Sequence, residues 1–170
     1  MPRLHVCSLA LIAETVGKTG ARSLVTLLSP GTEVQRPMHI LPERHLHLAV
    51  SDIVEATPGQ VLPEATHLDE LLKFVYAWDH AEPMLIHCFA GVSRSTAAVY
   101  IAVCALAPKR DEFNVARSLR AASPTASPNT LLVALADDAL GRGGRMREAI
   151  AEIGRGRECF EGEPFALELN

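Results

Sequence analysis

One stretch of the sequence limits the fold of this chain more than any other. Residues 96–107 are apolar almost all round, so a helix formed by them must lie at the centre of the domain. Just before them, residues 84–87 form a short apolar run that predicts a buried strand. A strand and a helix that are both buried need further layers of structure on either side. The sequence therefore predicts an α/β domain built around this unit.

The remaining residues supply the other layers. Strands are predicted at residues 4–8, 23–28 and 45–50, and helices at 8–19, 63–79, 111–122, 129–140 and 145–153. This order is typical of an α/β fold with a small, mostly parallel sheet flanked by helices on both faces, a three-layer sandwich. We expect a single domain over residues 1–157. Glycines and glutamates then replace the apolar pattern, which predicts a loose acidic tail over residues 158–170.

The composition excludes several classes of protein. The chain has 170 residues, which is too few for two well-packed domains. Its net charge of −4 disfavours binding to nucleic acid, and it has no apolar run of the roughly 18–20 residues that a membrane span needs. We therefore expect neither nucleic acid nor membrane as a partner. The four cysteines are far apart, which favours a reducing, cytoplasmic location in which a thiol is chemically active.

The residues between the buried strand and the buried helix, H-C-F-A-G-V-S-R-S (87–95), are the best candidates for chemistry. Gly91 permits a turn, and in a curled loop six consecutive backbone N–H groups converge and bind an anion. They belong to Phe89, Ala90, Gly91, Val92, Ser93 and Arg94. The helix that follows directs its positive end at the same place, and the guanidinium of Arg94 can hold two phosphate oxygens at once. The segment therefore predicts a phosphate-binding loop.

Cys88 lies at the base of this loop. The N–H dipoles, the helix end and Arg94 favour its thiolate, which is the nucleophilic form of cysteine. Such a thiolate can attack a phosphate in line and form a thiophosphate intermediate that water then hydrolyses. Ser95 is expected to donate a hydrogen bond to the thiolate as it leaves, and His87 to support the loop from behind. An inert, buried cysteine is the alternative interpretation of Cys88.

The nine residues H-C-F-A-G-V-S-R-S resemble the signature loop of the cysteine-dependent protein tyrosine phosphatases, in which His-Cys, five residues, Arg and then Ser or Thr recur. The segment S-P-N-T-L-L (127–132) is similar to the Ser-Pro-Asn stretch that opens a late helix in dual-specificity phosphatases. The resemblance covers roughly residues 23–140 and points to the small bacterial and dual-specificity-like members. It implies a phosphatase-like fold, no metal or other cofactor, and a mobile acid loop before the cysteine. It also implies a phosphorylated protein or peptide as substrate and phosphate as product.

The leaving group of such a reaction needs a proton, and in the family an Asp some thirty-odd residues before the cysteine supplies it. Asp52 lies at a comparable separation from Cys88 and follows a predicted strand. If the strands are parallel, both residues emerge at the same edge of the sheet. The sequence around Asp52, A-V-S-D-I, lacks the Trp-Pro-Asp of the family. Glu55 is the reserve candidate for the acid, and a turn or capping role is the alternative for Asp52.

Three residues outside the loop also have predicted roles. Asn129 is expected near the start of the late helix, where it either stabilises that helix or forms a hydrogen bond with a neighbouring loop. Cys7 ends the first predicted strand and is a candidate resolving thiol for Cys88. Cys104 falls on the apolar helix and is expected to pack in the core.

The predicted function is a protein phosphatase that hydrolyses phosphotyrosine through a cysteinyl-phosphate intermediate, with phosphoserine and phosphothreonine as further candidate substrates. A rhodanese-like sulfurtransferase is one alternative, although Ser95 and Asp52 favour phosphoryl chemistry. A catalytically dead, phosphate-binding adaptor is the other, although each catalytic group of the family has a counterpart here. Residues 31–44 and 51–63 contain no Phe, Tyr or Trp to hold a phosphotyrosyl ring, which predicts a shallow or permissive pocket.

Overall fold

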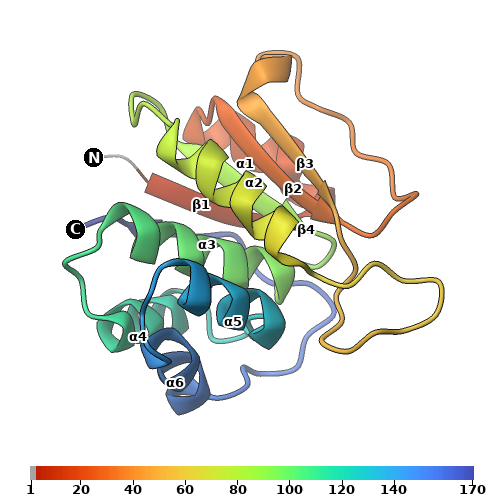
Figure 1. The fold of residues 1–170 in the computed structure, drawn as a ribbon. Coiled ribbons are helices and arrows are strands. Elements are labelled where there is room, and N and C mark those ends of the chain that lie inside the picture. The colour runs from red at the N-terminus through yellow and green to blue at the C-terminus, as the bar shows by residue number, and fades with distance from the viewer. Residues whose placement is uncertain (1–2) are drawn as a thin grey trace.

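The structure, a computed structural model, describes residues 3–170. Within them, five strands form one sheet in the order β3-β2-β4-β1-β5 (Figure 1). The strands are β1 (Arg3–Ser8), β2 (Ser23–Leu28), β3 (His45–Ala49), β4 (Met84–Cys88) and β5 (Phe165–Glu168). The first four are parallel to their neighbours, and β5 runs antiparallel to β1 at one edge. The predicted small, mostly parallel sheet is confirmed.

Helices cover both faces of this sheet, as predicted. The first, α1 (Ile12–Thr19), packs on one face, where Ile12 and Val16 lie in one buried cluster with Leu24 and Leu85. The other face carries α2 (Ala65–Tyr76), α3 (Arg94–Leu106), α4 (Glu112–Ala122), α5 (Thr130–Ala139) and α6 (Arg145–Ile153). Figure 1 shows α4, α5 and α6 gathered beyond α3, and α4 also contacts the edge strand β5. In the part of the chain that the structure describes, none of the helices combines the length and the hydropathy that crossing a bilayer requires.

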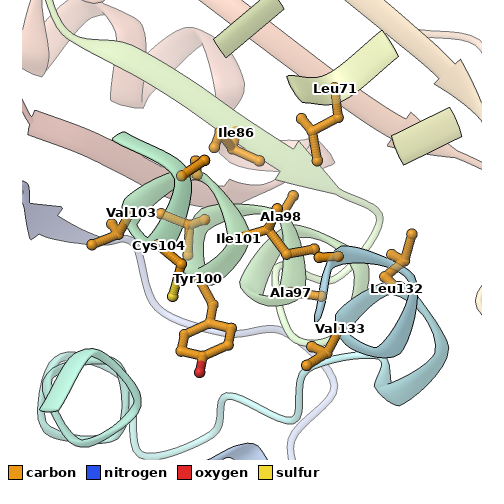
Figure 2. Close-up of a cluster of buried hydrophobic side chains, with 14 of the residues drawn as sticks. Leu71, Ile86, Ala97, Ala98, Tyr100, Ile101, Val103, Cys104, Leu132 and Val133 are labelled. Atoms are coloured by element: carbon orange, nitrogen blue, oxygen red, sulfur yellow. The ribbon is translucent and has the colours of Figure 1, made fainter. Parts of the chain in front are cut away.

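The central helix explains the apolar run that dominates the sequence. Every residue of α3 from Arg94 to Ala105 is buried. Figure 2 shows the side chains of Ile86, Leu71 and Leu132, from β4, α2 and α5, gathered around this helix. A helix with neighbours on all sides needs apolar residues on all sides, which is why its sequence shows no amphipathic period. The helix therefore fixes where the end of β4 lies relative to the rest of the domain.

The prediction of a loose tail is wrong. Residues 158–170 contain β5, whose residues Phe165–Glu168 pair with β1, and Leu167 is buried in the main core. A strand of four residues with one buried side chain is too short to show a clear alternation in the sequence. The segment before β5 instead leads the chain back to the sheet.

A chain of three polar side chains crosses the interior of the sheet beside β4. The Nδ1 atom of His87 lies 3.0 Å from the carbonyl oxygen of Cys88, and its Nε2 atom lies 2.7 Å from the hydroxyl of Thr26. A carbonyl oxygen can only accept, so Nδ1 carries the proton and Nε2 accepts from Thr26. The Thr26 oxygen lies 2.8 Å from Nε2 of His45, which therefore donates to it. Burial lowers the pKa of both His87 and His45 to about 4, so both rings are neutral at pH 7.

We expect acid to weaken the fold through these histidines. Because each pKa is lower in the folded chain than the ordinary value of 6.5, the unfolded chain binds protons first as the pH falls. The stabilisation is complete above about pH 6.5 and declines toward pH 4. The fully buried His87 contributes at most about 3 kcal/mol to the free energy of unfolding. Urea unfolding between pH 7 and pH 4.5 measures the decline.

Carboxylates also titrate in the lower part of this range, so the imidazole resonances identify the histidine contribution. In an NMR titration, the resonances of His87 should not move above about pH 5. A midpoint near pH 6.5 for His87 would contradict the conclusion that burial keeps its ring neutral in its hydrogen bond with Thr26.

Candidate active site

The signature loop (residues 87–95) connects the end of β4 to the start of α3. The sulfur of Cys88 is buried, accepts the N–H of Gly91 at 3.3 Å and lies 3.1 Å from the hydroxyl of Ser95. Gly91 has a φ of 71°, and a Cβ atom there would lie 2.9 Å from the carbonyl carbon of Cys7. Only glycine therefore lets the loop curl this closely against β1. The predicted proximity of Ser95 to the thiol is present in the structure.

The carbonyl oxygens of the loop are bonded to its surroundings. They accept four N–H groups from three neighbouring segments: Leu9 donates to Phe89, Gly162 to Ala90, Ser127 to Val92, and Asn129 to Ser93. In a trans peptide the C=O and the N–H of the next residue point in opposite directions. The N–H groups that follow these carbonyls are therefore turned to the other side, where the Gly91 N–H meets the Cys88 sulfur. This orientation is what an anion-binding loop requires.

Arg94 is the first residue of α3 and is 7% exposed. Its Nη1 atom donates to the carbonyl oxygen of Val50 at 2.9 Å and to the hydroxyl of Ser29 at 3.2 Å. Its Nε atom is buried and has no hydrogen-bond partner within residues 3–170. A buried donor without an acceptor is costly, and an oxyanion that accepts from Nε would remove that cost.

Asp52 lies beside the signature loop. Since β3 and β4 both run parallel to β2, the segments that follow them emerge at the same edge, as expected. The Oδ1 atom of Asp52 accepts the hydroxyl of Ser93 at 2.7 Å and the amide of Asn129 at 2.9 Å. Glu55 is exposed, and its carboxylate has no hydrogen bond or ion pair within the described residues. The structure therefore brings Asp52, and not Glu55, into contact with the loop.

Asn129 combines the two roles that the sequence left open. Its side-chain oxygen accepts the N–H of Leu132 at 3.0 Å and thereby caps α5. Its side-chain amide donates to Asp52 and, at 3.1 Å, to the carbonyl oxygen of Ile53. The contact with Asp52 joins residues far apart in the chain, so no local pattern could have revealed it. Asn129 therefore ties the segment after β3 to the segment before α5.

Cys7 is not placed to act as a resolving thiol. In the register of β1 and β4, Cys7 pairs with His87, whereas Ser8 pairs with Cys88. Paired residues point to the same face of a sheet and successive residues to opposite faces. Cys7 accordingly packs on the side of α1, where burial raises the pKa of its thiol to about 12. Cys104 is buried in the main core, as predicted.

The segment between α6 and β5 contributes contacts that the sequence did not predict. The N–H of Gly162 donates to the carbonyl oxygen of Ala90 at 2.8 Å, and the hydroxyl of Ser8 donates to the carboxylate of Glu161. A Cβ atom at Gly162 would lie 2.8 Å from the carbonyl oxygen of Gly91. This segment therefore supports the signature loop from outside. Its glycines and glutamates resemble an ordinary polar loop, so no sequence signal marks the contact.

Comparisons with known proteins agree with this geometry. The sequence profile of the family described as Protein-tyrosine phosphatase matches residues 56–126, which include the whole signature loop. A comparison with curated proteins found no match. Three similar solved structures are DUSP15, a PTP-2 phosphatase from Cydia pomonella, and human DUSP28.

These structures share the fold at low sequence identity. DUSP15 is 21% identical with a TM-score of 0.63, and the match covers 89% of this chain and 92% of that one. The Cydia pomonella phosphatase is 21% identical with a TM-score of 0.61, covering 79% and 84%. Human DUSP28 is 20% identical with a TM-score of 0.61, covering 82% and 88%. Residues 56–126, which contain the signature loop, are therefore similar to the protein-tyrosine phosphatase family, and the chain shares its fold with small dual-specificity phosphatases.

Proposed function

We propose that this protein hydrolyses phosphotyrosine in proteins or peptides through a cysteinyl-phosphate intermediate, and that it also accepts phosphoserine and phosphothreonine. One observation carries the proposal: the sulfur of Cys88 lies under inward-facing N–H groups, in a loop that ends at an arginine with a buried, unpartnered Nε. A nucleophile and donors for an oxyanion therefore meet at one place. That combination is what phosphoryl transfer to a thiolate requires.

In the first step, the Cys88 thiolate attacks the phosphorus atom, so that an S–P bond forms as the P–O bond to the leaving group breaks. The three remaining phosphate oxygens accept hydrogen bonds from the loop N–H groups and from Arg94, which stabilise the charge that they carry. Asp52, held at the loop by Ser93 and Asn129, gives its proton to the leaving oxygen.

In the second step, water attacks the phosphorus atom of the intermediate. Asp52, now a carboxylate, accepts a proton from this water, and the S–P bond breaks to release inorganic phosphate. The departing Cys88 thiolate accepts a hydrogen bond from the Ser95 hydroxyl, 3.1 Å away. His87 holds the backbone of the cysteine in place through its bond to the Cys88 carbonyl oxygen.

The entrance to the site supports a broad choice of phosphorylated residue. The segments at residues 31–44 and 51–63 contain no Phe, Tyr or Trp that would clamp a phosphotyrosyl ring. Phe89 is the aromatic residue of the signature loop, and its side chain is 62% exposed. An entrance without such a clamp admits shorter phosphoserine side chains as well as phosphotyrosine.

Neither alternative function is favoured. A sulfurtransferase would use Cys88, but it has no need for a carboxylic acid such as Asp52 beside the loop. A phosphate-binding adaptor would need Arg94 but not a nucleophile. Release of phosphate from an aryl phosphate, compared with thiocyanate formation from thiosulfate and cyanide, separates phosphatase from sulfurtransferase. Binding of a phosphopeptide without turnover would favour the adaptor.

The first prediction for this site concerns the nucleophile. Cys88→Ser should lower turnover by at least about 10³-fold, because a hydroxyl is a far weaker nucleophile than a thiolate. Binding of inorganic phosphate, measured by calorimetry, should be retained because the loop N–H groups and Arg94 are unchanged. Cys104→Ala, which removes a buried thiol outside the site, is the control and should keep turnover. Turnover of Cys88→Ser within tenfold of the parent would contradict the assignment.

The second prediction concerns the guanidinium group. Arg94→Lys keeps the charge but loses the planar fork, so phosphate affinity should fall by about tenfold or more and kcat/KM by about 10²-fold. Arg117→Lys, on the exposed surface of α4, is the matched control and should change neither quantity. If the Arg94→Lys variant binds phosphate as tightly as the parent, Arg94 does not hold the phosphate.

The third prediction concerns the acid. Asp52→Asn keeps an oxygen that can accept from Ser93 and Asn129 but removes the transferable proton. The rate with a phosphotyrosine peptide should therefore fall by about 10²–10⁴-fold, and the rate with an activated aryl phosphate, which departs without a proton, should fall much less. Glu55→Gln is the control and should leave both rates unchanged. Equal, small losses for the two substrates would exclude Asp52 as the general acid.

A further inference from the structure

A hollow adjoins the candidate active site. Its volume is about 1000 Å³, at the upper end of the range for ligand sites. It begins at Asp52 and Ser93, passes α5 and α6, and is closed by residues 154–160. Figure 1 shows the chain after α6 returning past α5 toward the sheet, and this returning segment forms the outer wall. We call this hollow the C-terminal cavity.

The wall of the C-terminal cavity is held in place by its backbone. The N–H of Gly156 donates to the hydroxyl of Ser127 at 3.0 Å, and the N–H of Arg157 donates to the carbonyl oxygen of Pro124 at 2.9 Å. A Cβ atom at Gly156 would lie 2.5 Å from the carbonyl carbon of Thr125. The returning segment is therefore packed tightly against the residues that precede α5, and the cavity is a formed feature of the fold.

The lining combines an apolar surface with free positive charge. Ala134 and Ala151, on α5 and α6, and Phe160, on the returning segment, contribute accessible apolar side chains, whereas Val133 and Ile150 of the lining are buried. Arg155 and Arg157 also line the cavity, are exposed, and have no side-chain hydrogen bond or ion pair within residues 3–170.

The other charged groups of the lining leave a net positive rim. Arg147 is already paired with Asp138 at 2.8 Å. Glu158 is the one acidic residue of the returning segment in the lining, and Asp52 lies at the opposite end, at the signature loop. The outer wall therefore carries two guanidinium groups and one carboxylate that are not paired within residues 3–170, and its net charge is positive.

We propose that the C-terminal cavity binds the residues next to the phosphorylated one and selects phosphopeptides that carry an apolar residue followed by acidic residues. The inference rests on the proposed phosphatase function and names the class of substrate. Asp52 and Ser93 belong both to the candidate active site and to the cavity, so a peptide whose phosphate lies above Cys88 passes directly into it. The apolar surface takes the aliphatic or aromatic side chain, and Arg155 and Arg157 attract the carboxylates.

The charge favours a peptide over a phospholipid as the occupant. An acyl chain would cover the apolar surface but carries no charge for Arg155 and Arg157. A peptide supplies an apolar side chain and an acidic one within a few residues of the phosphate. Attraction of this kind between exposed charges is screened by salt, so the preference for acidic peptides should weaken as ionic strength rises.

The experiment compares two phosphotyrosine peptides and an activated aryl phosphate. The peptides share a leucine after the phosphotyrosine and differ in the next two residues, which are glutamates in one and lysines in the other. We expect the parent protein to favour the glutamate peptide by about tenfold in kcat/KM, as two rim charge pairs allow. The double variant Arg155→Ala/Arg157→Ala should lose this preference and keep its rate with the aryl phosphate within about twofold.

The control variant is Lys109→Glu. It changes the net charge by the same two units, but Lys109 is exposed in the turn after α3, at the end of that helix opposite the signature loop. It should keep the peptide preference.

A second variant tests the apolar surface. Ala151 is exposed on α6 and lines the cavity, so Ala151→Trp should fill part of it without disturbing the core. Both peptides should then show a KM raised by about fivefold or more, while the aryl phosphate is hydrolysed as by the parent. A thermal unfolding curve confirms that the variant is folded.

Each other outcome overturns the inference in a distinguishable way. If the parent does not hydrolyse the aryl phosphate, the proposed function itself is wrong. If it does but shows no preference between the peptides, the cavity does not select acidic residues. An equal loss for all three substrates in the variants would show a structural role only. If Ala151→Trp impairs hydrolysis of a short-chain phospholipid monophosphate and leaves both peptides unaffected, the occupant is a lipid.

Discussion

The guanidinium of Arg94 connects the main parts of the structure at one point. The backbone of Arg94 starts the buried central helix. The Nη1 atom of its side chain donates hydrogen bonds to Ser29 and Val50, which lie in the segments that follow β2 and β3. Those bonds hold the guanidinium in one position, while its buried Nε atom has no hydrogen-bond partner within residues 3–170. A donor that is already oriented costs little to reorganise during a reaction, which is the basis of electrostatic preorganisation.

The signature loop depends on supports from several directions. Ser93 is bonded to Asp52 and Asn129, so the acid, the loop and the start of α5 form one connected unit. The neutral pair of His87 and Thr26 holds the strand that leads into the loop. Because these bonds come from β2, the segment after β3 and the start of α5, a disturbance in any of them reaches the cysteine through the backbone.

The sequence predicted the parts of the structure that depend on local patterns. The buried unit at residues 84–107, the strand Ser23–Leu28 and the helix Arg145–Ile153 were predicted closely, because period and turn residues mark them in short windows. The position of Asp52 beside the loop was expected from the direction of the strands and from the separation from the cysteine that the family resemblance implies. The strand Phe165–Glu168 was missed because its four residues are too few to show a period.

Contacts between distant segments could not be predicted. Nothing local indicates that Asn129 meets Asp52, or that Glu112 and Arg142 form a buried ion pair at 2.8 Å between α4 and the turn after α5. A polar residue in a helix or turn is usually exposed, and burial with a partner becomes apparent only once the helices are packed. The contact of Gly162 with the loop also joins segments that are far apart in the sequence, so no local pattern predicts it.

That contact has a consequence for the chain during its synthesis. The ribosome makes Cys88 and the signature loop before it makes residues 161–168, which bond Ala90 and Ser8 and add the last strand beside β1. Until then the carbonyl oxygen of Ala90 lacks the hydrogen bond that it accepts from the N–H of Gly162. A nascent chain therefore carries the Cys88 thiol in a loop that lacks one of its supports, and this support forms only when the last strand of the sheet has been made.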